Sequence, residues 1–531
     1  MSLPDLLFQQ PGLRFDIPAL RQQLAFSFAS GGSGQALDEL FSRGARTDPA
    51  FNEQCFRPDL YVDDLVRLLG RWQRATGPNH RSNHLRLTRI LTTASTNKDT
   101  IELRHGVLRE LLARVDLRAK VTELWGTLAE FKELLESAEL GKRSHGVARR
   151  VTILRKLVSA ADQLGTFSDS NSHLRVLAEF GEMLGASSAF QSLRSLLDFE
   201  SQRAVVDLRL SLAYDGSIRQ LELVAAREPQ AKSLFGATVA RWFVWIFSAL
   251  RGYRLPEEEI LGRSIQTVFD GVETDVLWFL QLQLDLEFYL AALAFSDQAK
   301  THGLAVCLPE MSESEQALEI QQLFNPFLLE EPKAPVPADL HLPRRSIALL
   351  TGPNSGGKTR LLQALGLSQM LAQCGFFVPA GSAKLPLLSG LFVSLVHGQA
   401  SDEHEGRLGS ELTRIRRMFE LLDFNSLVLL DELCSGTNPS EGEEIFELVV
   451  SLLVELTPVA VITTHFLEFA QRLEREGRLT LRFLQVDLDA HSVPTYQFVP
   501  GVATTSLARK TAERLGVTRE ALQQLINRKA R

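Results

Sequence analysis

A glycine-rich run that ends in a lysine and a threonine carries the most specific chemistry of this 531-residue chain. It reads Thr351-Gly-Pro-Asn-Ser-Gly-Gly-Lys-Thr359, with the spacing Gly, four residues, Gly-Lys-Thr. We expect positive φ at its glycines, so that backbone N–H groups and a helix N-terminus face bound phosphates. Lys358 would contact the β- and γ-phosphates and Thr359 would hold Mg²⁺. The predicted cofactors are a nucleoside triphosphate and Mg²⁺, and the predicted nucleotide contacts are Gly352, Pro353, Asn354, Ser355, Gly356, Gly357, Lys358 and Thr359.

The flanks of this run provide the strand and the helix that a phosphate loop requires. Residues 346–350 are an apolar run typical of a buried strand. Residues 361–374 carry apolar side chains at helical spacing, with Gly366 as the one helix breaker. The order strand, loop, helix favours a nucleotide site over a turn without a ligand.

A pair of adjacent carboxylates follows a second strand-like run, Leu427-Val-Leu-Leu-Asp-Glu432. Such a pair could end a strand in a solvated turn. Downstream of a phosphate loop, however, it has the place of the metal-binding and water-activating acids. We therefore predict that Asp431 joins Thr359 in binding the metal and that Glu432 is the general base.

A single histidine ends a third buried run, at residues 459–464. Histidines after strands are usually structural. The carboxyl ends of parallel strands, however, meet at the edge where phosphate loops lie, so a neutral imidazole there could contact a γ-phosphate or polarise the attacking water. We predict this catalytic role for His465, beside Glu432 and Lys358.

The order of these motifs is that of the ABC-type ATPases, and the residues within the motifs resemble those of the MutS family. The resemblance rests on the segments 351–359, Phe377-Val-Pro-Ala380, 430–437, Thr463-Thr-His465 and Pro500-Gly-Val-Ala-Thr-Thr-Ser506. It covers the C-terminal third of the chain. The resemblance implies a Mg²⁺-dependent ATP hydrolase in which Asn354 contacts the nucleotide. It also implies a homodimer formed head to tail through the ATPase domains, with the loop 435–442 at the interface.

Two segments depart from the family pattern. Gly406 stands where the family carries a serine that reaches the partner's γ-phosphate; Arg407 or Ser410 could replace it, or Arg407 could pair with a surface carboxylate. Upstream of the phosphate loop, Ala334-Pro-Val-Pro-Ala338 offers no aromatic ring for the adenine. Phe327 could substitute, or it could be an ordinary core residue.

The part of the chain before the phosphate loop has the spacing of long helices. Apolar residues recur three and four apart over 65–72, 101–115, 121–140, 151–164 and 274–302. Residues 206–212 and 218–224 alternate apolar and polar around Asp215-Gly216, which predicts a β hairpin. In MutS-like proteins an inserted β element touches DNA, but this hairpin could equally pack on its own helices.

These patterns predict a multidomain protein, with a mainly α-helical core and lever region, an inserted hairpin, and then an α/β P-loop ABC-type ATPase domain. The predicted parts are an N-terminal helical region at 1–95, a MutS-like core, lever and clamp-like hairpin at 96–317, the ATPase domain at 318–500 and a helical dimerisation tail at 501–531. Neither the mismatch-recognition domain nor the Smr nuclease domain of the family is expected.

The composition is that of an ordinary soluble protein, with 45% hydrophobic and 23% charged residues. The longest dense apolar run, 242–250, is shorter than the roughly 20 residues of a membrane span. Four widely separated cysteines suggest neither disulfides nor a zinc site. We therefore expect a cytoplasmic protein without a membrane partner.

The net charge of −7 gives no global signal for nucleic acid, so DNA contact would depend on local basic clusters. One cluster comprises Arg67, Arg71, Arg74, Arg81, Arg86 and Arg89, and the other Lys142, Arg143, Arg149, Arg150, Arg155 and Lys156. Solvated helix faces carry similar runs.

The leading hypothesis is a MutS-like, DNA-binding ATPase that acts as an ATP-gated dimeric clamp in DNA repair or recombination. Its DNA would be branched or unspecific duplex rather than a mismatch. The alternative is a nucleotide-switched ATPase that grips protein partners and does not bind DNA.

Overall fold

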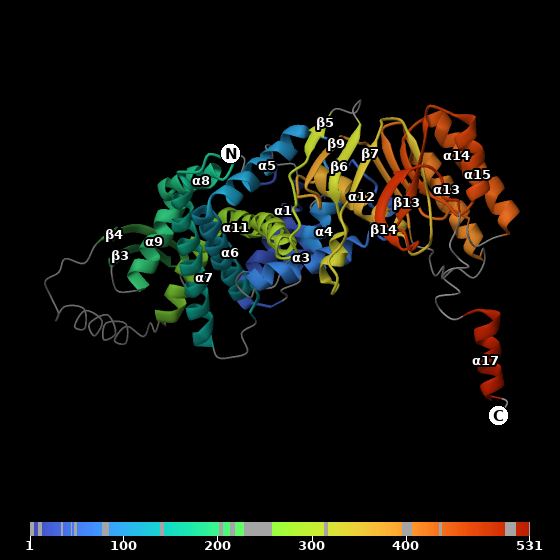
Figure 1. Ribbon diagram of the computed structural model, residues 1–531. Helices are drawn as coiled ribbons and strands as arrows, with labels where there is room; N and C mark the ends of the chain where they lie inside the picture. The colour runs from blue at the N-terminus through green and yellow to red at the C-terminus, as the bar shows by residue number, and fades with distance from the viewer. Residues whose placement is uncertain are drawn as a thin grey trace. The chain divides into compact units, whose positions relative to one another are not determined.

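The structure is a computed structural model of the chain (Figure 1). It describes residues 5–8, 13–32, 36–43, 45–46, 50–76, 84–137, 143–200, 205–212, 218–227, 257–312, 317–395, 406–434, 438–504 and 517–529. The chain forms two compact units that are interleaved in sequence. The first contains 1–47, 73–87 and 106–291, and the second contains 48–72, 88–105 and 292–531.

The first unit is built mainly from helices whose apolar faces form one core. They are α1 (Ile17–Ser30), α2 (Ala36–Ser42), α6 (Val115–Glu136), α7 (Arg143–Leu164), α8 (Arg175–Ala186), α9 (Ser188–Glu200) and part of α11 (Glu257–Thr301). Two short strands, β1 (Leu13–Arg14) and β2 (Ala45–Arg46), pair antiparallel. Phe28 of α1 stacks on Phe269 of α11 with 3.7 Å between the ring centroids, which ties the first helix to the last.

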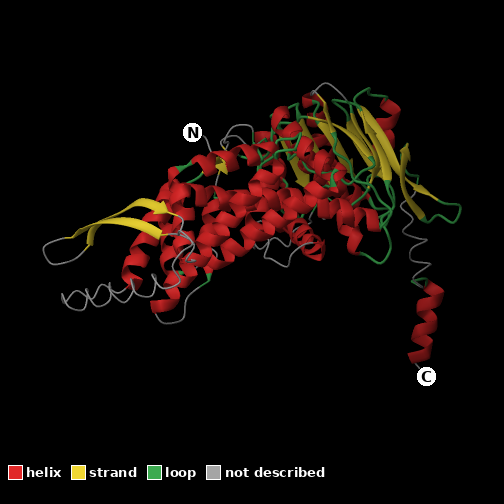
Figure 2. Ribbon diagram, turned by 90° about the vertical axis from the view of Figure 1, so that its left-hand side faces the viewer, coloured by secondary structure: helices red, strands yellow, loops and turns green. Residues whose placement is uncertain are grey.

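The predicted hairpin is present in the first unit as β3 (Val205–Leu212) and β4 (Ile218–Arg227). The two strands pair antiparallel, with Leu210 opposite Leu221. Figure 2 shows them projecting from the helices of the same unit. The predicted turn at Asp215-Gly216 lies outside the described residues.

Helix α11 is the longest described element, at 45 residues, or about 68 Å at 1.5 Å per residue. Its stretch Ser264–Thr301 is long and apolar enough to cross a membrane by length and composition, but 94% of the apolar window is buried inside the protein. This burial is the ordinary condition of a core helix. Three further helices, like α11, contribute residues to both units: α3 (Val62–Thr76), α4 (His84–Thr92) and α5 (Lys98–Ala113).

The second unit contains a six-stranded sheet in the order β10-β11-β12-β8-β13-β14. Its strands are β8 (Ile347–Thr351), β10 (Gly390–Ser394), β11 (Ser426–Leu430), β12 (Val459–Thr463), β13 (Leu481–Leu488) and β14 (Pro494–Pro500). The first five strands in that order run parallel and β14 is antiparallel. β8, β11 and β12 are buried along their whole length, which explains why their sequences are continuous apolar runs.

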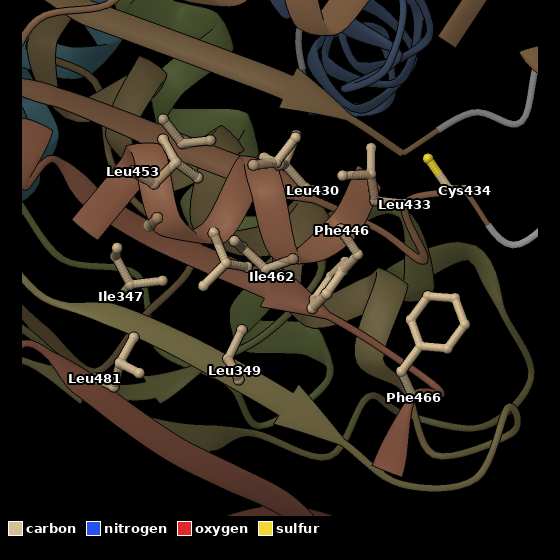
Figure 3. Close-up of a cluster of buried hydrophobic side chains, with 14 of the residues drawn as sticks. Ile347, Leu349, Leu430, Leu433, Cys434, Phe446, Leu453, Ile462, Phe466 and Leu481 are labelled. Atoms are coloured by element: carbon tan, nitrogen blue, oxygen red, sulfur yellow. The ribbon is translucent and has the colours of Figure 1, made fainter. Parts of the chain in front are cut away.

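Helices cover both faces of this sheet. They are α12 (Lys358–Gln373), α13 (Gly406–Leu421), α14 (Pro439–Leu456) and α15 (Leu467–Glu476). On one face, Phe446 and Leu453 of α14 pack over strand residues such as Ile462 (Figure 3). On the other face lies α12.

A second sheet of the same unit has the order β5-β9-β6-β7. Its strands are β5 (Glu310–Ser312), β6 (Leu318–Leu323), β7 (Ala338–Leu342) and β9 (Ser382–Pro386). A short 3₁₀ helix, Pro326–Glu330, lies between β6 and β7.

Residues from the N-terminal part of the chain complete the second unit around α12. Gly366 of α12 faces Leu60 on one side and Leu429 of β11 on the other, and a Cβ there would lie 2.8 Å and 3.0 Å from their side chains. The glycine inside this helix is therefore explained by close packing on two sides. At the helix end, Gln373 donates to Ser95 O over 3.1 Å.

The C-terminal helix α17 (Arg519–Lys529) is part of the predicted tail. Leu522 and Ile526, one helical turn apart, are both exposed on it.

Candidate functional site: a nucleotide cavity at the sheet edge

The phosphate loop joins β8 to α12, as the sequence predicted, and its glycines serve two different purposes. Gly352 and Gly357 have φ of +135° and +84°, a region that glycine adopts without strain. Gly356 does not share this conformation, contrary to our expectation. A Cβ at Gly356 would lie 2.7 Å from the Val486 side chain of β13, so a glycine is required there by close packing.

Lys358 is held inside the loop. The residue is 3% exposed, and its ammonium donates to Gly352 O over 3.0 Å and to Pro353 O over 3.2 Å. The Glu432 carboxylate lies 3.6 Å away. Burial lowers the pKa of Lys358, while the nearby carboxylates of Glu432 and Asp431 act in the opposite direction. The ammonium is thus placed where a phosphate could replace the loop carbonyls as its partner.

The acidic pair joins the phosphate loop directly. Thr359 Oγ1 donates to Asp431 Oδ2 over 2.6 Å, and Thr463 Oγ1 donates to Asp431 Oδ1 over 2.5 Å. Thr463 Oγ1 also accepts from Glu432 N over 2.9 Å. A hydroxyl and a carboxylate in contact are the hard oxygen ligands that Mg²⁺ prefers. The residues present therefore fit this metal, and Thr359 and Asp431 would be its protein ligands.

The turn after Asp431 is strained and held from outside. Glu432 and Cys434 have φ of +48° and +60°, which is uncommon for residues with a Cβ. The Glu411 carboxylate of α13 accepts from Cys434 N over 2.8 Å, which supports the turn. Burial, with help from Glu411, raises the pKa of the Cys434 thiol to about 11, so this thiol stays protonated near neutral pH. None of the motifs above predicts this contact of Glu411 with the turn.

His465 lies just beyond β12, at the same edge of the sheet as the loop and the acidic pair. β12 lies between β11, which ends before Asp431, and β8, which ends before the loop. The histidine is exposed, and its ring lies against Phe466 with 4.3 Å between centroids. Its position leaves the imidazole accessible to a ligand at this edge.

A cavity of about 520 Å³ opens beside the loop. Five of the predicted nucleotide contacts line it, whereas Gly352, Pro353 and Gly356 do not. The five are Asn354, Ser355, Gly357, Lys358 and Thr359. A volume in this range suits a small molecule the size of a nucleotide.

The cavity also contains an aromatic ring that the sequence did not predict, beside the phosphate loop: a Cβ at Gly357 would lie 3.2 Å from the Tyr496 ring. Tyr496 of β14 lines the cavity, with φ of +63°. The Lys333 ammonium lies 5.9 Å from the Tyr496 ring centroid. Phe327, considered above for the adenine, is not among the lining residues and packs edge-on against Tyr61. Pro335 and Val336 do line the cavity.

We expect Tyr496→Ala to weaken ATP binding about fivefold to tenfold, because a ring stacked on the base contributes on the order of 1 kcal/mol. The hydrolysis rate at saturating ATP should be unchanged, since the ring would contact the base and is none of the groups assigned to hydrolysis. Titration with a fluorescent ATP analogue measures the affinity. Tyr496→Phe is the matched control and should bind as the wild type. Equal affinity of the Ala variant and the wild type would remove Tyr496 from the base site.

The segment 405–410, which departs from the family pattern at Gly406, lies partly within the described residues. Gly406 and Ser410 belong to the first turns of α13. Glu405 and the side chain of Arg407 lie outside the described part. A trans role for Arg407 or Ser410 therefore stays a prediction.

Much of the two basic clusters has structural partners. Arg149 is 9% exposed and donates to Ser27 O, Phe28 O and Leu135 O over 2.8 to 3.1 Å, so it closes the ends of α1 and α6. Arg149 is therefore not one of the surface cations that the cluster could offer to DNA. Other members pair with carboxylates: Arg67 with Asp64, Arg71 with Glu330, Arg89 with Glu53, Arg86 with Asp285 and Lys156 with Glu130. Arg81, Lys142 and the side chain of Arg143 lie outside the described part.

Comparison with known proteins gives the same family as the motifs. Residues 348–529 match the family model of MutS domain V. A Thermus thermophilus protein named endonuclease MutS2 is 33% identical over 283 residues, which are 52% of this chain and 36% of that protein. A protein of the same name from Thermomicrobium roseum is 31% identical over 271 residues, 50% of this chain and 34% of its own length. The chain thus spans about a third of the length of the curated relatives that it matches.

The matched range begins inside β8 and contains the phosphate loop, the acidic pair and His465. The resemblance expected from these motifs is confirmed. Residues 348–529 are thus the part of the chain that matches the MutS family, as its domain V.

Proposed function

We propose that this chain is a MutS-type ATPase that hydrolyses ATP and couples the nucleotide cycle to DNA in repair or recombination. One observation carries the enzymatic part of the proposal. The Thr359 hydroxyl and the Asp431 carboxylate are in direct contact although they are 72 residues apart in sequence. This contact joins the phosphate loop to the acidic pair at the mouth of a cavity of nucleotide size.

In this proposal ATP binds with its phosphates on the loop amides and its base toward Tyr496. The Lys358 ammonium exchanges the carbonyls of Gly352 and Pro353 for phosphate oxygens. Thr359 and Asp431 would hold Mg²⁺, which would supply positive charge to the phosphate oxygens.

Glu432 then takes a proton from the attacking water. Its backbone is fixed by Thr463 Oγ1, and its carboxylate already lies at the phosphate-loop lysine. His465 contacts the γ-phosphate or orients the water from the neighbouring strand end. Releasing Lys358 to the phosphate would free the Glu432 carboxylate to act as a base.

We also propose a homodimer formed through the ATPase domains. Leu448 and Leu452, one turn apart on α14, are 57% and 37% exposed, and α17 exposes Leu522 and Ile526. Exposed apolar pairs of this kind are typical of surfaces that a partner covers. A monomer mass by sedimentation equilibrium in the presence of ATP would contradict the dimer. We place the protein in the cytoplasm, and detection of the protein in a membrane fraction would contradict that location.

The coupling to DNA is tested by the ATPase rate with and without duplex, single-stranded and four-way-junction DNA, at low and moderate salt. We expect one form to change the steady-state rate severalfold, with an effect that weakens as salt rises because phosphate contacts release counterions. Glu432→Gln serves as the control for contaminating ATPases. A branched or unspecific duplex substrate would support an ATP-gated clamp.

A second function is favoured by the carboxylate partners of the basic clusters, which leave fewer cations for phosphates. It is a nucleotide-switched ATPase whose helical part binds a protein. A rate indifferent to all three DNA forms, together with no salt-dependent DNA binding, would favour this function over the first.

A further inference from the structure

The end of β10 is the backbone partner of Asp431. Ser394 O accepts from Asp431 N over 2.9 Å, in continuation of the parallel pairing between β10 and β11. Among the strands that the structure describes, β10 is the outermost on this side of the sheet. Its outward backbone groups therefore have no neighbouring strand there, and an edge of this kind is free to shift unless something else pairs with it.

Two charged side chains occupy that edge on either side of Ser394. Leu395 N donates to Asp59 Oδ1 over 2.8 Å, and Arg414 Nη2 donates to Val393 O over 3.3 Å. Backbone groups of successive residues in a strand point to opposite edges, so those of Val393 and Leu395 share the outer edge while those of Ser394 face β11. The groups of Val393 and Leu395 that are held from outside thus flank the Ser394 carbonyl that holds Asp431.

Asp59 and Arg414 also bind each other. Arg414 Nη2 lies 2.5 Å from Asp59 Oδ2, and Asp59 is 2% exposed while the Arg414 side chain is 41% exposed. A buried carboxylate with two charged or polar donors is fixed in one geometry, since loss of either donor would leave a desolvated charge. The ion pair Asp59–Arg414, called the clip below, therefore holds the end of β10 in one position.

The segment that carries Asp59 is itself anchored at the phosphate-loop helix. The next residue, Leu60, is fully buried against Gly366 of α12. Asp59 thus comes from a segment wedged between the strand end that holds Asp431 and the helix that follows Lys358. Its distance in sequence, 336 residues from Leu395, hides this relation from any motif search.

We propose that Asp59 is a positioning residue of the ATPase site: together with Arg414 it fixes the end of β10, and through Ser394 O it fixes Asp431 for metal binding. The inference rests on the proposed function, in which Asp431 holds Mg²⁺. It assigns part of the ATPase site to a segment outside the range 348–529 that matches domain V.

The test is the Mg²⁺ dependence of Asp59→Ala. We expect the concentration of Mg²⁺ that half-saturates hydrolysis to rise severalfold and kcat to fall roughly tenfold or more, because small displacements of a catalytic group have large effects on rate. Affinity for a fluorescent ATP analogue without Mg²⁺ should change less than about twofold, since Lys358 and the loop are untouched. Asp63→Ala is the matched control, because Asp63 lies on the same segment and its exposed carboxylate pairs with Arg57.

A double-mutant cycle with Arg414→Ala separates the clip from general loss of structure. The two single variants and the double variant should show similar losses, because either change opens the same clip. Asp59→Asn retains an acceptor for Leu395 N, so it should fold and show a smaller shift in Mg²⁺ dependence, and it decides the matter if Asp59→Ala does not fold. Wild-type Mg²⁺ dependence in folded Asp59→Ala or Asp59→Asn, or additive losses in the cycle, would overturn the proposal.

The binding measurement keeps this test separate from the test of the proposed function. A wild-type chain that binds the analogue with Mg²⁺ but does not hydrolyse ATP refutes the proposed function alone, and the Mg²⁺ shift in binding then still tests Asp59. A wild-type affinity that does not respond to Mg²⁺ refutes the inference.

Discussion

A Glu432→Gln variant should bind ATP with nearly wild-type affinity and hydrolyse it at least about 100-fold more slowly, the usual contribution of a positioned general base. The amide has the size of the carboxylate but does not accept a proton at neutral pH. Its Nε2 or Oε1 can still lie near the Lys358 ammonium, so the phosphate loop should keep its conformation. Single-turnover hydrolysis and titration with a fluorescent ATP analogue measure the two effects separately.

Glu420→Gln is the matched control for this substitution. Glu420 is an exposed carboxylate on α13 that pairs with Arg416, away from the cavity, so its loss should leave both affinity and rate unchanged. Normal hydrolysis by Glu432→Gln would show that another group activates the water. A large loss of affinity would instead show that Glu432 acts mainly by holding the loop.

Lys358→Ala should lose both binding and hydrolysis. Each charge-assisted hydrogen bond from the ammonium to a phosphate contributes about 1.5–3 kcal/mol, so the affinity for ATP should fall by one to two orders of magnitude or more. The folded state should tolerate the change, because the buried ammonium is desolvated and its burial lowers its pKa. Equilibrium binding of the fluorescent analogue measures the loss.

The control for Lys358→Ala is thermal unfolding without nucleotide, which should stay close to the wild type. Lys358→Arg keeps the charge but not the shape, and it should recover part of the binding at most, since a planar guanidinium does not reproduce the two hydrogen bonds of the compact ammonium to Gly352 O and Pro353 O. Wild-type affinity in Lys358→Ala would refute the phosphate role of the loop.

Local sequence was sufficient to predict the strands and helices around the phosphate loop. The strand before it, the helix after it, the strand before Asp431 and the hairpin strands all depend on short-range patterns of apolar residues and turns. These elements were predicted within a few residues of their bounds. The helix predicted over 274–302 proved to be part of the longer α11, because its first turns lack the dense apolar pattern of the rest.

Residues that act through tertiary packing could not be predicted in the same way. Asp59, Glu411 and Tyr496 reach the site from distant segments, and nothing in their local sequence differs from that of an ordinary surface or core residue. The reason for Gly356 lies in Val486, about 130 residues later. Arg149 looked like a surface cation because the carbonyls that bury it belong to the ends of two other helices.

The predicted domain bounds stay a prediction. They were drawn from sequence motifs, whereas the two compact units of the structure are defined by the contacts within each unit. The division into these units assigns residues 48–72 and 88–105 to the unit that contains the nucleotide cavity. Sequence alone separates such segments from the ATPase, because they carry none of its motifs.

The contribution of these early segments also constrains how the chain folds during synthesis. Ser95 and Gln373, which hydrogen-bond at the end of α12, are 278 residues apart. At a synthesis rate of roughly 5–20 residues per second, about 15–55 s pass between the synthesis of Ser95 and that of Gln373. Leu60 and Ile90 are buried in the finished unit, so their apolar surfaces stay uncovered by these partners throughout that interval. Folding of the ATPase unit therefore depends on contacts between distant segments that form late in synthesis. Until they form, the nascent chain is the form of the protein most exposed to aggregation and most in need of chaperones.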